Sequence, residues 1–310
     1  MPDLREFMFP SGDGMHQIHA VEWLPPEEPP RAVVQIVHGM SEYILRYDAF
    51  ARFLTGRGFV VVGHDHLGHG GTAIGREEYG FLGDRDGWEH LTQDTRTLRE
   101  LTGARFPGLP YFMLGHSMGS FLARTYLIRW PGSLSGCILS GTGQPAPALV
   151  TLGKALAKFF VRVRGANTIS KLLAGLSTGA YNKQFRPNRT GVDWISRDSA
   201  MVDAYAADPL CRFIPTVGMY RDMMEGIQFI GNRDNLSNMD PDTPVHFFSG
   251  DHDPVGDMGA GVRRIFECFR EAGVKDLSIK LYPDGRHEML NELCRDGVYR
   301  DILDWLERHI

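Results

Sequence analysis

The stretch Tyr111-Phe112-Met113-Leu114-Gly115-His116-Ser117-Met118-Gly119-Ser120 decides the fold of this chain. A short apolar run enters a G-x-S-x-G turn, and apolar residues then recur at helical spacing between Phe121 and Trp130. A serine between a buried strand and a helix, flanked by glycines, is typical of a nucleophile elbow, a strained turn that lifts the hydroxyl out of the sheet. The stretch therefore predicts that Ser117 is a catalytic nucleophile, with an ordinary glycine-rich turn as the alternative.

A base and a carboxylate are needed to activate this serine, because a hydroxyl is a weak nucleophile at neutral pH. The stretch Leu277–Tyr282 alternates like a strand and leads through a short turn to His287, the candidate base. An earlier strand pattern is followed by Asp253, the candidate carboxylate. Asp251 and Asp257 are the alternatives, but Asp251 is close enough to the strand end to cap the turn, whereas Asp253 extends farther into the loop.

Two backbone amides are the candidate donors to an oxyanion. In a nucleophile elbow the first donor is the N–H of the residue after the serine, here Met118. The second comes from the loop after an early strand, and the strand pattern Ala32–Val37 is followed by His38-Gly39-Met40-Ser41. Because Gly39 permits a sharp turn, we expect the Met40 N–H to point inward. Both donors matter, since the loss of one such donor costs about 10²- to 10³-fold in rate.

Taken together, these residues resemble the monoacylglycerol lipase and lysophospholipase branch of the α/β-hydrolases, also called serine aminopeptidase-like hydrolases. The resemblance covers nearly the whole chain, and its motifs are His38-Gly39-Met40-Ser41-Glu42 with Arg46-Tyr47, His64-Asp65-His66-Leu67-Gly68-His69-Gly70, Gly115-His116-Ser117-Met118-Gly119, Asp208-Pro209-Leu210-Cys211, Gly250-Asp251-His252-Asp253-Pro254-Val255, and His287-Glu288 with Asn291-Glu292. It implies that Ser117, Asp253 and His287 form a catalytic triad, and that Met40 and Met118 supply the oxyanion amides. The chain departs from the family at Tyr43, where a histidine often follows the glutamate.

Strand patterns that mostly alternate with helical patterns indicate an α/β fold, with an eight-stranded, mostly parallel sheet flanked by helices. The strand patterns cover residues 6–9, 17–23, 32–37, 59–63, 111–114, 136–140, 245–249 and 277–282. The first two are expected to form a hairpin. After residue 143 the alternation stops, and a long helical region runs to Asp240-Pro241. We expect an α/β-hydrolase core in residues 1–143 and 241–310, and a helical cap over the active site in residues 144–240.

The composition is that of an ordinary globular protein of 310 residues, with 43% hydrophobic and 23% charged residues. The basic and apolar regions of a signal peptide are lacking in the N-terminal residues Met1-Pro2-Asp3-Leu4-Arg5-Glu6. No apolar run is long enough to span a membrane. We therefore expect a cytoplasmic protein. The segment Pro25-Pro26-Glu27-Glu28-Pro29-Pro30 is expected to be a stiff linker. The cysteines lack C-x-x-C spacing and fall in or beside apolar segments, which favours buried free thiols over disulfides or metal ligands, at Cys137, Cys211, Cys268 and Cys294.

The predicted cap is strongly basic. Between Pro145 and Val192 it has eight lysines and arginines and no acidic residue. Lys154, Lys158 and Arg162 recur every four residues, while apolar residues follow helical spacing on another face. One interpretation is a helix that rests on an anionic membrane surface; the other is a cap helix whose apolar face packs on the pocket and whose lysines are solvated. Either way an apolar pocket is expected, and its candidate substrate-binding residues are Phe159, Phe160, Trp194, Phe213, Met219 and Met223.

The cluster His64, Asp65, His66 and His69 contains the residue types of a metal site. However, the family that the chain resembles has a structural turn here, and a serine mechanism needs no metal, so we expect no metal and no other cofactor. The sequence contains no phosphate-cradling loop and no nucleic-acid fold signature, which argues against nucleotide and nucleic-acid partners.

The predicted function is hydrolysis of the carboxylic esters of single-chain lipids, monoacylglycerol or lysophospholipid, through an acyl-enzyme on Ser117. One alternative is a small-ester carboxylesterase. Another is an aminopeptidase of the same fold, which would need an acidic pocket for the amino terminus of its substrate. A third is a non-catalytic ligand-binding protein. An epoxide hydrolase or dehalogenase would have an aspartate in place of Ser117.

Overall fold

The computed structural model describes residues 3–26 and 29–310. The first two residues of the chain, and Glu27 and Glu28 in the middle of the predicted linker, lie outside the described residues. Each predicted strand is confirmed and lies within an observed one. The strands are β1 (Asp3–Pro10), β2 (Gln17–Leu24), β3 (Ala32–Val37), β4 (Phe59–His64), β5 (Tyr111–His116), β6 (Gly136–Ser140), β7 (Val245–Gly250) and β8 (Leu277–Tyr282).

The strands form one eight-stranded sheet in the order β1-β2-β4-β3-β5-β6-β7-β8. β1 and β2 form the predicted antiparallel hairpin, β2 is antiparallel to β4, and the remaining neighbours are parallel. The strands from β3 to β7 are buried along their whole length, because helices cover both faces of a parallel sheet. Since parallel strands end at the same edge, the loops that follow β3, β5, β7 and β8 meet there.

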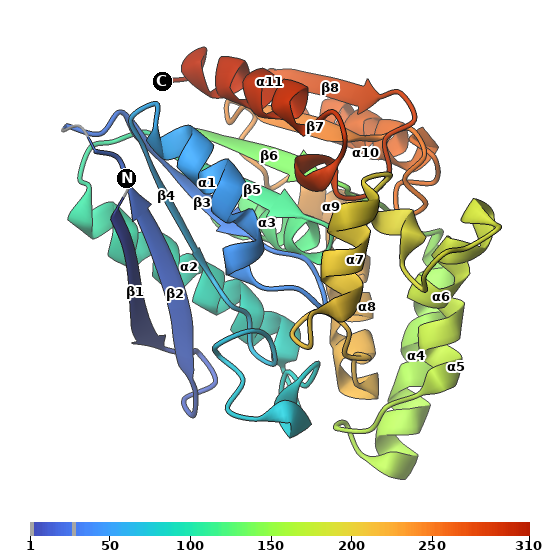
Figure 1. Ribbon diagram of the computed structural model, residues 1–310. Helices are drawn as coiled ribbons and strands as arrows, with labels where there is room; N and C mark the ends of the chain where they lie inside the picture. Colours follow the sequence, from blue (N-terminus) through green and yellow to red (C-terminus); the bar gives the residue numbers. More distant parts are fainter. Residues whose placement is uncertain (1–2, 27–28) are drawn as a thin grey trace.

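Helices cover the two faces of the sheet (Figure 1). α1 and α11 pack on one face around Phe50 and Trp305, whereas α2, α3 and α10 pack on the other around Leu98 and Phe269. The two large apolar clusters are thus separated by the sheet. These helices are α1 (Asp48–Thr55), α2 (Gly87–Arg105), α3 (Met118–Arg129), α10 (Ala260–Glu271) and α11 (Arg295–Glu307), with the short 3₁₀ helices η1 (Ile44–Tyr47), η2 (Arg76–Glu78) and η5 (Met289–Asn291) between them.

Residues 144–240, here called the insertion, connect β6 to its neighbour β7 through a series of helices and loops. The helices are α4 (Pro147–Arg164), α5 (Lys171–Leu176), α6 (Thr178–Tyr181), η3 (Asn182–Phe185), η4 (Asp193–Ile195), α7 (Ser199–Ala207), α8 (Val217–Ile230) and α9 (Arg233–Leu236). α8 packs on α2 and α3 of the core as well as on α4. The buried Arg124 of α3 donates to Gly143 O, just before the insertion, at 3.0 Å and to Ile230 O at the end of α8 at 3.3 Å, so it joins the start of the insertion and α8 to the core.

The cysteines are free thiols, as their spacing predicted. Cys137 and Cys211 are buried as predicted, whereas Cys268 and Cys294 are only half-buried, which corrects the prediction of burial for these two. Across the part of the chain that the structure describes, we find no helix whose length and apolar character would let it cross a membrane.

Candidate active site

Ser117 lies in the turn between β5 and α3. Its backbone is strained, with φ of 52° and ψ of −120°, a conformation that residues other than glycine rarely adopt. The turn is held by the Ser117 N–H, which donates to Ser140 O at 2.9 Å. It also requires Gly119, because a Cβ atom at that position would lie 1.9 Å from Val37 O. The packing around the turn therefore maintains the strain, and Ser117 lines a cavity.

Asp253, after β7, and His287, after β8, form a buried pair. Nδ1 of His287 lies 3.0 and 2.9 Å from the two Asp253 carboxylate oxygens, which also accept from Ser249 Oγ and the Val255 N–H, each at 2.9 Å. Burial opposes ionisation of Asp253, but His287 and the other donors outweigh burial and lower the pKa of Asp253. Burial likewise opposes protonation of His287, but the Asp253 carboxylate outweighs it and raises the pKa of His287.

The two other carboxylates considered for this position point elsewhere. Asp251 accepts from Nδ1 of its neighbour His252 at 2.7 Å. Asp257 is exposed and pairs with Arg264 at 2.9 Å. Of these three aspartates, Asp253 is therefore the one whose carboxylate reaches His287.

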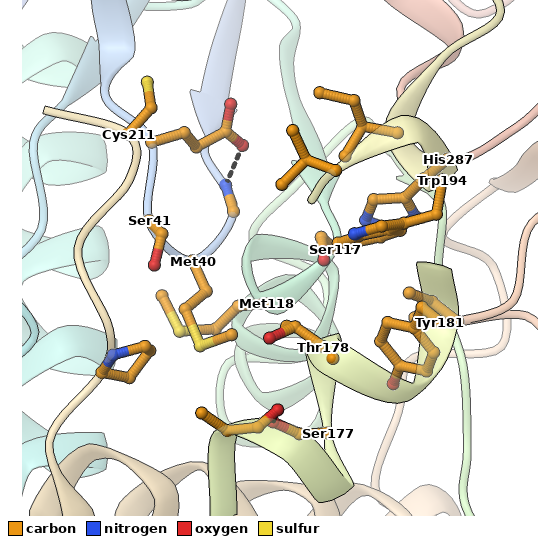
Figure 2. A pocket seen from close by; sticks show the side chains of 18 of the residues that line it. Met40, Ser41, Ser117, Met118, Ser177, Thr178, Tyr181, Trp194, Cys211 and His287 are labelled. Atoms are coloured by element: carbon orange, nitrogen blue, oxygen red, sulfur yellow. Dashed lines mark hydrogen bonds between the residues drawn. The ribbon is translucent and has the colours of Figure 1, made fainter. Parts of the chain in front are cut away.

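Two other rings lie close to the imidazole of His287. Its centroid is 4.7 Å from that of His116 and 4.9 Å from that of Trp194, which belongs to the insertion. Figure 2 shows the Trp194 and His287 side chains side by side, next to Ser117. Burial, together with the nearby His287, lowers the pKa of His116 to about 3. His116 is therefore a neutral neighbour of His287 and does not compete with it for a proton near neutral pH.

The loop after β3 is held by a buried network of charges. Glu42 accepts the Gly39 N–H at 2.5 Å. Arg46 donates to Glu42 at 2.7 Å and, through two nitrogens, to Glu288 at 2.9 and 2.6 Å. Burial raises the pKa of Glu42, whereas for Glu288 the Arg46 charge outweighs burial and lowers the pKa to about 2. Since Glu288 directly follows the candidate base, this network joins the loop with the candidate oxyanion amide to the loop with the base.

The histidines that suggested a metal site support the same loop. The His66 N–H donates to His38 Nε2 at 3.0 Å, and the Ser41 N–H donates to His69 Nε2 at 3.2 Å. Burial lowers the pKa of His38 and lowers that of His69 to about 4, so both rings are neutral acceptors at neutral pH. Within residues 3–26 and 29–310, histidine, cysteine and acidic side chains form no group of three or more that could hold a metal ion.

A cavity of about 440 Å³ opens beside Ser117, between the core and the insertion. Its walls are mainly apolar, and Figure 2 shows Met40 and Met118 on one side of Ser117, with Tyr181 and Trp194 on the other. The predicted oxyanion residues and half of the predicted substrate-binding residues line this cavity. They are Met40, Met118, Trp194, Phe213 and Met223.

The other three predicted substrate-binding residues lie away from the cavity, which corrects the prediction. Phe159 points into solvent with 59% of its surface exposed. Phe160 is half-buried against the core, with the guanidinium of Arg164 over its ring. Met219 is fully buried near the start of α8. Apolar character alone does not distinguish a residue that packs between helices from one that lines a cavity.

The orientation of α4 also differs from the prediction. Two of its lysines lie beside α8, where Lys154 and Lys158 are 3.4 and 3.1 Å from Glu225, although Lys158 is itself exposed. Val150 and Ala157 are buried, whereas several large apolar side chains face solvent. Leu149, Leu152, Phe159 and Val163 are 64%, 66%, 59% and 61% exposed. The interpretation that the apolar face packs on the pocket is therefore wrong for these four side chains, whereas Lys158 is solvated as that interpretation expected.

Sequence reasoning missed two groups of residues at this site. Ser177, Thr178 and Tyr181 line the cavity, but they lie in the basic segment, where no apolar pattern pointed to them. The contacts among Glu42, Arg46 and Glu288 were also missed, although these residues stand in the quoted motifs. Glu42 and Arg46 have the i, i+4 spacing of an ion pair on a helix, which was the available signal.

The family described as "Serine aminopeptidase, S33" matches residues 28–294. The chain is 28% identical to a monoacylglycerol lipase of Mycolicibacterium smegmatis, over 98% of both proteins. It is 27% identical to human monoglyceride lipase, over 91% of this chain and 84% of that protein. Its fold is similar to that of a highly thermostable carboxyl esterase from Bacillus coagulans, with a TM-score of 0.91 and 31% identity over 98% of both chains. The family match, the relatives and the sheet topology agree, and this chain belongs to the serine aminopeptidase S33 family of α/β-hydrolases.

Proposed function

We propose that this protein hydrolyses the carboxylic esters of single-chain lipids, with Ser117, Asp253 and His287 as its catalytic triad. The observation that carries the proposal is the strained Ser117 that shares an apolar cavity with the buried His287–Asp253 pair. A serine hydroxyl needs a base, and the base needs a carboxylate that fixes its tautomer and orientation. The cavity, of about 440 Å³ and mainly apolar, suits the acyl chain of a small lipid.

The proposed mechanism has two acyl-transfer steps. His287 takes the proton of Ser117 as the hydroxyl oxygen attacks the ester carbonyl, and the Met40 and Met118 N–H groups donate to the oxyanion that forms. The carbon–oxygen bond to the alcohol then breaks, and His287 gives the alcohol its proton. Water repeats the sequence on the acyl-enzyme, which releases the fatty acid and regenerates Ser117. Asp253 stays ionised throughout and stabilises the protonated imidazole.

The relatives support a glycerol ester as substrate. Those from M. smegmatis and human are named monoacylglycerol lipase and monoglyceride lipase, and the B. coagulans esterase was solved in complex with glycerol. A lysophospholipid has the same single acyl chain with a larger head group and is the second substrate class to test.

The carboxylates that line the cavity argue against an aminopeptidase, because both are already paired with an arginine. Glu42 and Glu288 are the acidic residues among those that line it, and both are buried. Arg46 donates to each of them, so neither carboxylate is free to bind the amino terminus of a peptide. An aminopeptidase would need an unpaired carboxylate at this place.

The first test is fatty-acid release from a monoacylglycerol and from a lysophosphatidylcholine of equal chain length. We expect the native protein to release fatty acid and the Ser117→Ala variant to release none. The ratio of the two rates ranks the head groups. Activity that persists in Ser117→Ala would overturn the triad, and native protein that releases fatty acid from neither substrate would overturn the lipid ester as substrate.

We also propose that α4 contacts the surface of a membrane or micelle. The exposed residues Leu149, Leu152, Phe159 and Val163 form an apolar stripe at helical spacing, and Arg162 and Arg164 beside it are exposed as well. Such a face gains free energy by entering the lipid interface, and the arginines favour anionic lipid. This contact would use the apolar face of the helix rather than the lysines, which are engaged with Glu225.

Sedimentation with phosphatidylglycerol vesicles and with phosphatidylcholine vesicles tests this contact. We expect the native protein to bind the anionic vesicles more strongly, and the double variant Leu152→Asp/Phe159→Asp to lose binding. Leu101→Asp, on the exposed side of α2, is the matched control and should bind like the native protein. Hydrolysis of a water-soluble short-chain ester should be the same in all three proteins. Equal sedimentation of the native protein and the double variant would reject the contact.

A further inference from the structure

The loop that carries the base, residues 286–292, is held against one turn of the insertion, residues 193–197. The Glu288 N–H donates to Ile195 O at 2.7 Å. Arg286 donates through one nitrogen to two carbonyl oxygens of the turn. The residues on either side of His287 are therefore bonded to the insertion rather than to the sheet.

Beyond these contacts, the end of the turn is fixed by Glu292. This carboxylate is fully buried and accepts from the Arg197 N–H at 2.5 Å and from Arg197 Nε at 3.0 Å. Ser196 Oγ donates to Asn291 O at 3.0 Å. Hydrogen bonds to a charged group are among the stronger ones in proteins, so this end of the base loop has little freedom to move alone.

Trp194 lies at the centre of the turn and contacts the base itself. Its ring centroid is 4.9 Å from that of His287, and the planes are inclined by 37°. Its own backbone is fixed, since the Trp194 N–H donates to Asn182 Oδ1 at 3.0 Å. On another side of the imidazole, a Cβ atom at Gly141 would lie 2.9 Å from His287 Cε1, which shows how closely the backbone approaches the ring.

We propose that the turn 193–197 positions the general base, with Trp194 as the positioning residue that fixes the tilt of the His287 ring. The inference rests on the proposed function, in which His287 is the base. Asp253 contacts one nitrogen of the imidazole, and a ring held through one atom can still tilt about that contact. The nearby rings of Trp194 and His116, with centroids 4.9 and 4.7 Å from that of His287, limit this tilt. A displacement of about 1 Å at a reacting group can cost about 10²-fold in rate.

This arrangement divides the insertion into two parts with different roles. The turn 193–197 has to stay on the core for His287 to be aligned, so it belongs functionally to the catalytic machinery. Among the described residues, the helices before this turn, α4 to α6, make no such hydrogen bonds with the base loop. Opening of the cavity would therefore be a movement of these helices.

The experiment measures hydrolysis of 4-nitrophenyl acetate, whose acyl group is too short to depend on the walls of the cavity. We expect Trp194→Leu to lower kcat about 10- to 100-fold with little change in KM, and Trp194→Phe to restore most of the rate because an aromatic face is present again. Arg197→Met tests the turn through a residue that does not line the cavity, and should lower kcat in the same way. Trp130→Leu, a half-buried tryptophan at the end of α3, is the matched control and should leave kcat unchanged.

A double-variant cycle with His287→Ala separates positioning from other effects. If Trp194 acts through the base, Trp194→Leu has no further effect on the residual rate of the His287→Ala protein. The same fold-loss in both backgrounds, or native kcat in both Trp194→Leu and Arg197→Met, would overturn the inference while leaving the proposed function intact. Full activity of His287→Ala itself would overturn the proposed function. Circular dichroism and thermal unfolding of each variant identify losses that come from misfolding.

Discussion

Arg46 donates to both carboxylate oxygens of Glu288, at 2.9 and 2.6 Å, and to the carboxylate of Glu42 at 2.7 Å, and both glutamates are buried. Removing the guanidinium leaves two buried carboxylates without a counter-charge. We expect Arg46→Met to lower the free energy of unfolding by about 3–5 kcal/mol in urea denaturation. Arg46→Lys should lose less, since it keeps the charge but not the planar pair of donors. Native stability of Arg46→Met would contradict this account.

The charge of Asp253 sets the pH range of activity. Because Asp253 raises the pKa of His287, kcat/KM should begin to fall above the ordinary histidine pKa of about 6.5 as the pH is lowered and the base becomes protonated. Asp253→Asn removes that charge, so the fall should move to lower pH, and kcat should drop by about 10³- to 10⁴-fold. A pH series of initial rates on a soluble ester measures both. An unmoved acid limb in Asp253→Asn would contradict the assignment.

His19 is expected to make stability depend on pH. Its hydrogen bond to Asp65, together with Glu6, outweighs partial burial and raises the pKa of His19 to about 9. A raised pKa means that the stabilisation is complete below the unfolded value of about 6.5 and is lost as the pH rises through about 9. Allowing for screening by water at this half-buried site, the free energy of unfolding should fall by about 1–2 kcal/mol over that range. Urea denaturation of His19→Gln should show a smaller fall than the native protein.

Two glycines should respond to alanine in opposite directions. Gly119→Ala places a Cβ atom 1.9 Å from Val37 O, and the backbone there cannot move away, so we expect a loss of about 3 kcal/mol or more, or no folded protein. Gly297→Ala in α11 meets nothing within 4 Å and should gain about 0.5–1 kcal/mol, because alanine favours the helix. Thermal unfolding of the two variants compares them directly.

Acyl-chain length should control the specificity constant. Each methylene that enters the apolar cavity contributes up to about 0.8 kcal/mol, so kcat/KM should rise up to about fourfold per carbon until the cavity is full. Met223→Trp reduces the space in the cavity and should move the plateau to a shorter chain. A series of saturated monoacylglycerols measures the profile, and a flat profile would show that the acyl chain lies outside this cavity.

The parts of the fold that the sequence predicted well are those in which local pattern and burial agree. The inner strands are continuous apolar runs because both faces of a parallel sheet are covered. Ser117, Asp253 and His287 could be placed because each follows a recognisable strand, and such loops gather at one edge of the sheet. The pairing of Asp253 with His287 and the place of Ser117 on the same cavity therefore follow from topology, although the three residues are far apart in the sequence.

The sequence predictions were wrong where the orientation of a side chain depends on a residue that is distant in the sequence. The pattern of α4 shows two faces, but the pairing of Lys154 and Lys158 with Glu225 depends on α8, which is distant in the sequence. An amphipathic pattern does not indicate which face of the helix packs against the rest of the protein. In the same way, Met219 and Met223 stand one helical turn apart on α8, and the first is buried in packing while the second lines the cavity.

β6 and β7 are parallel neighbours, so residues 144–240 leave from the end of one strand and return at the start of the other, but Gly143 and Ile230 lie close together because Arg124 donates to both. A segment attached in this way can be lengthened, shortened or exchanged with that of a relative while every strand keeps its register. New substrate ranges could thus be obtained by transplanting one continuous stretch of about a hundred residues, the size of a small domain. The graft would succeed only if its equivalent of the turn 193–197 fits the base loop of the recipient.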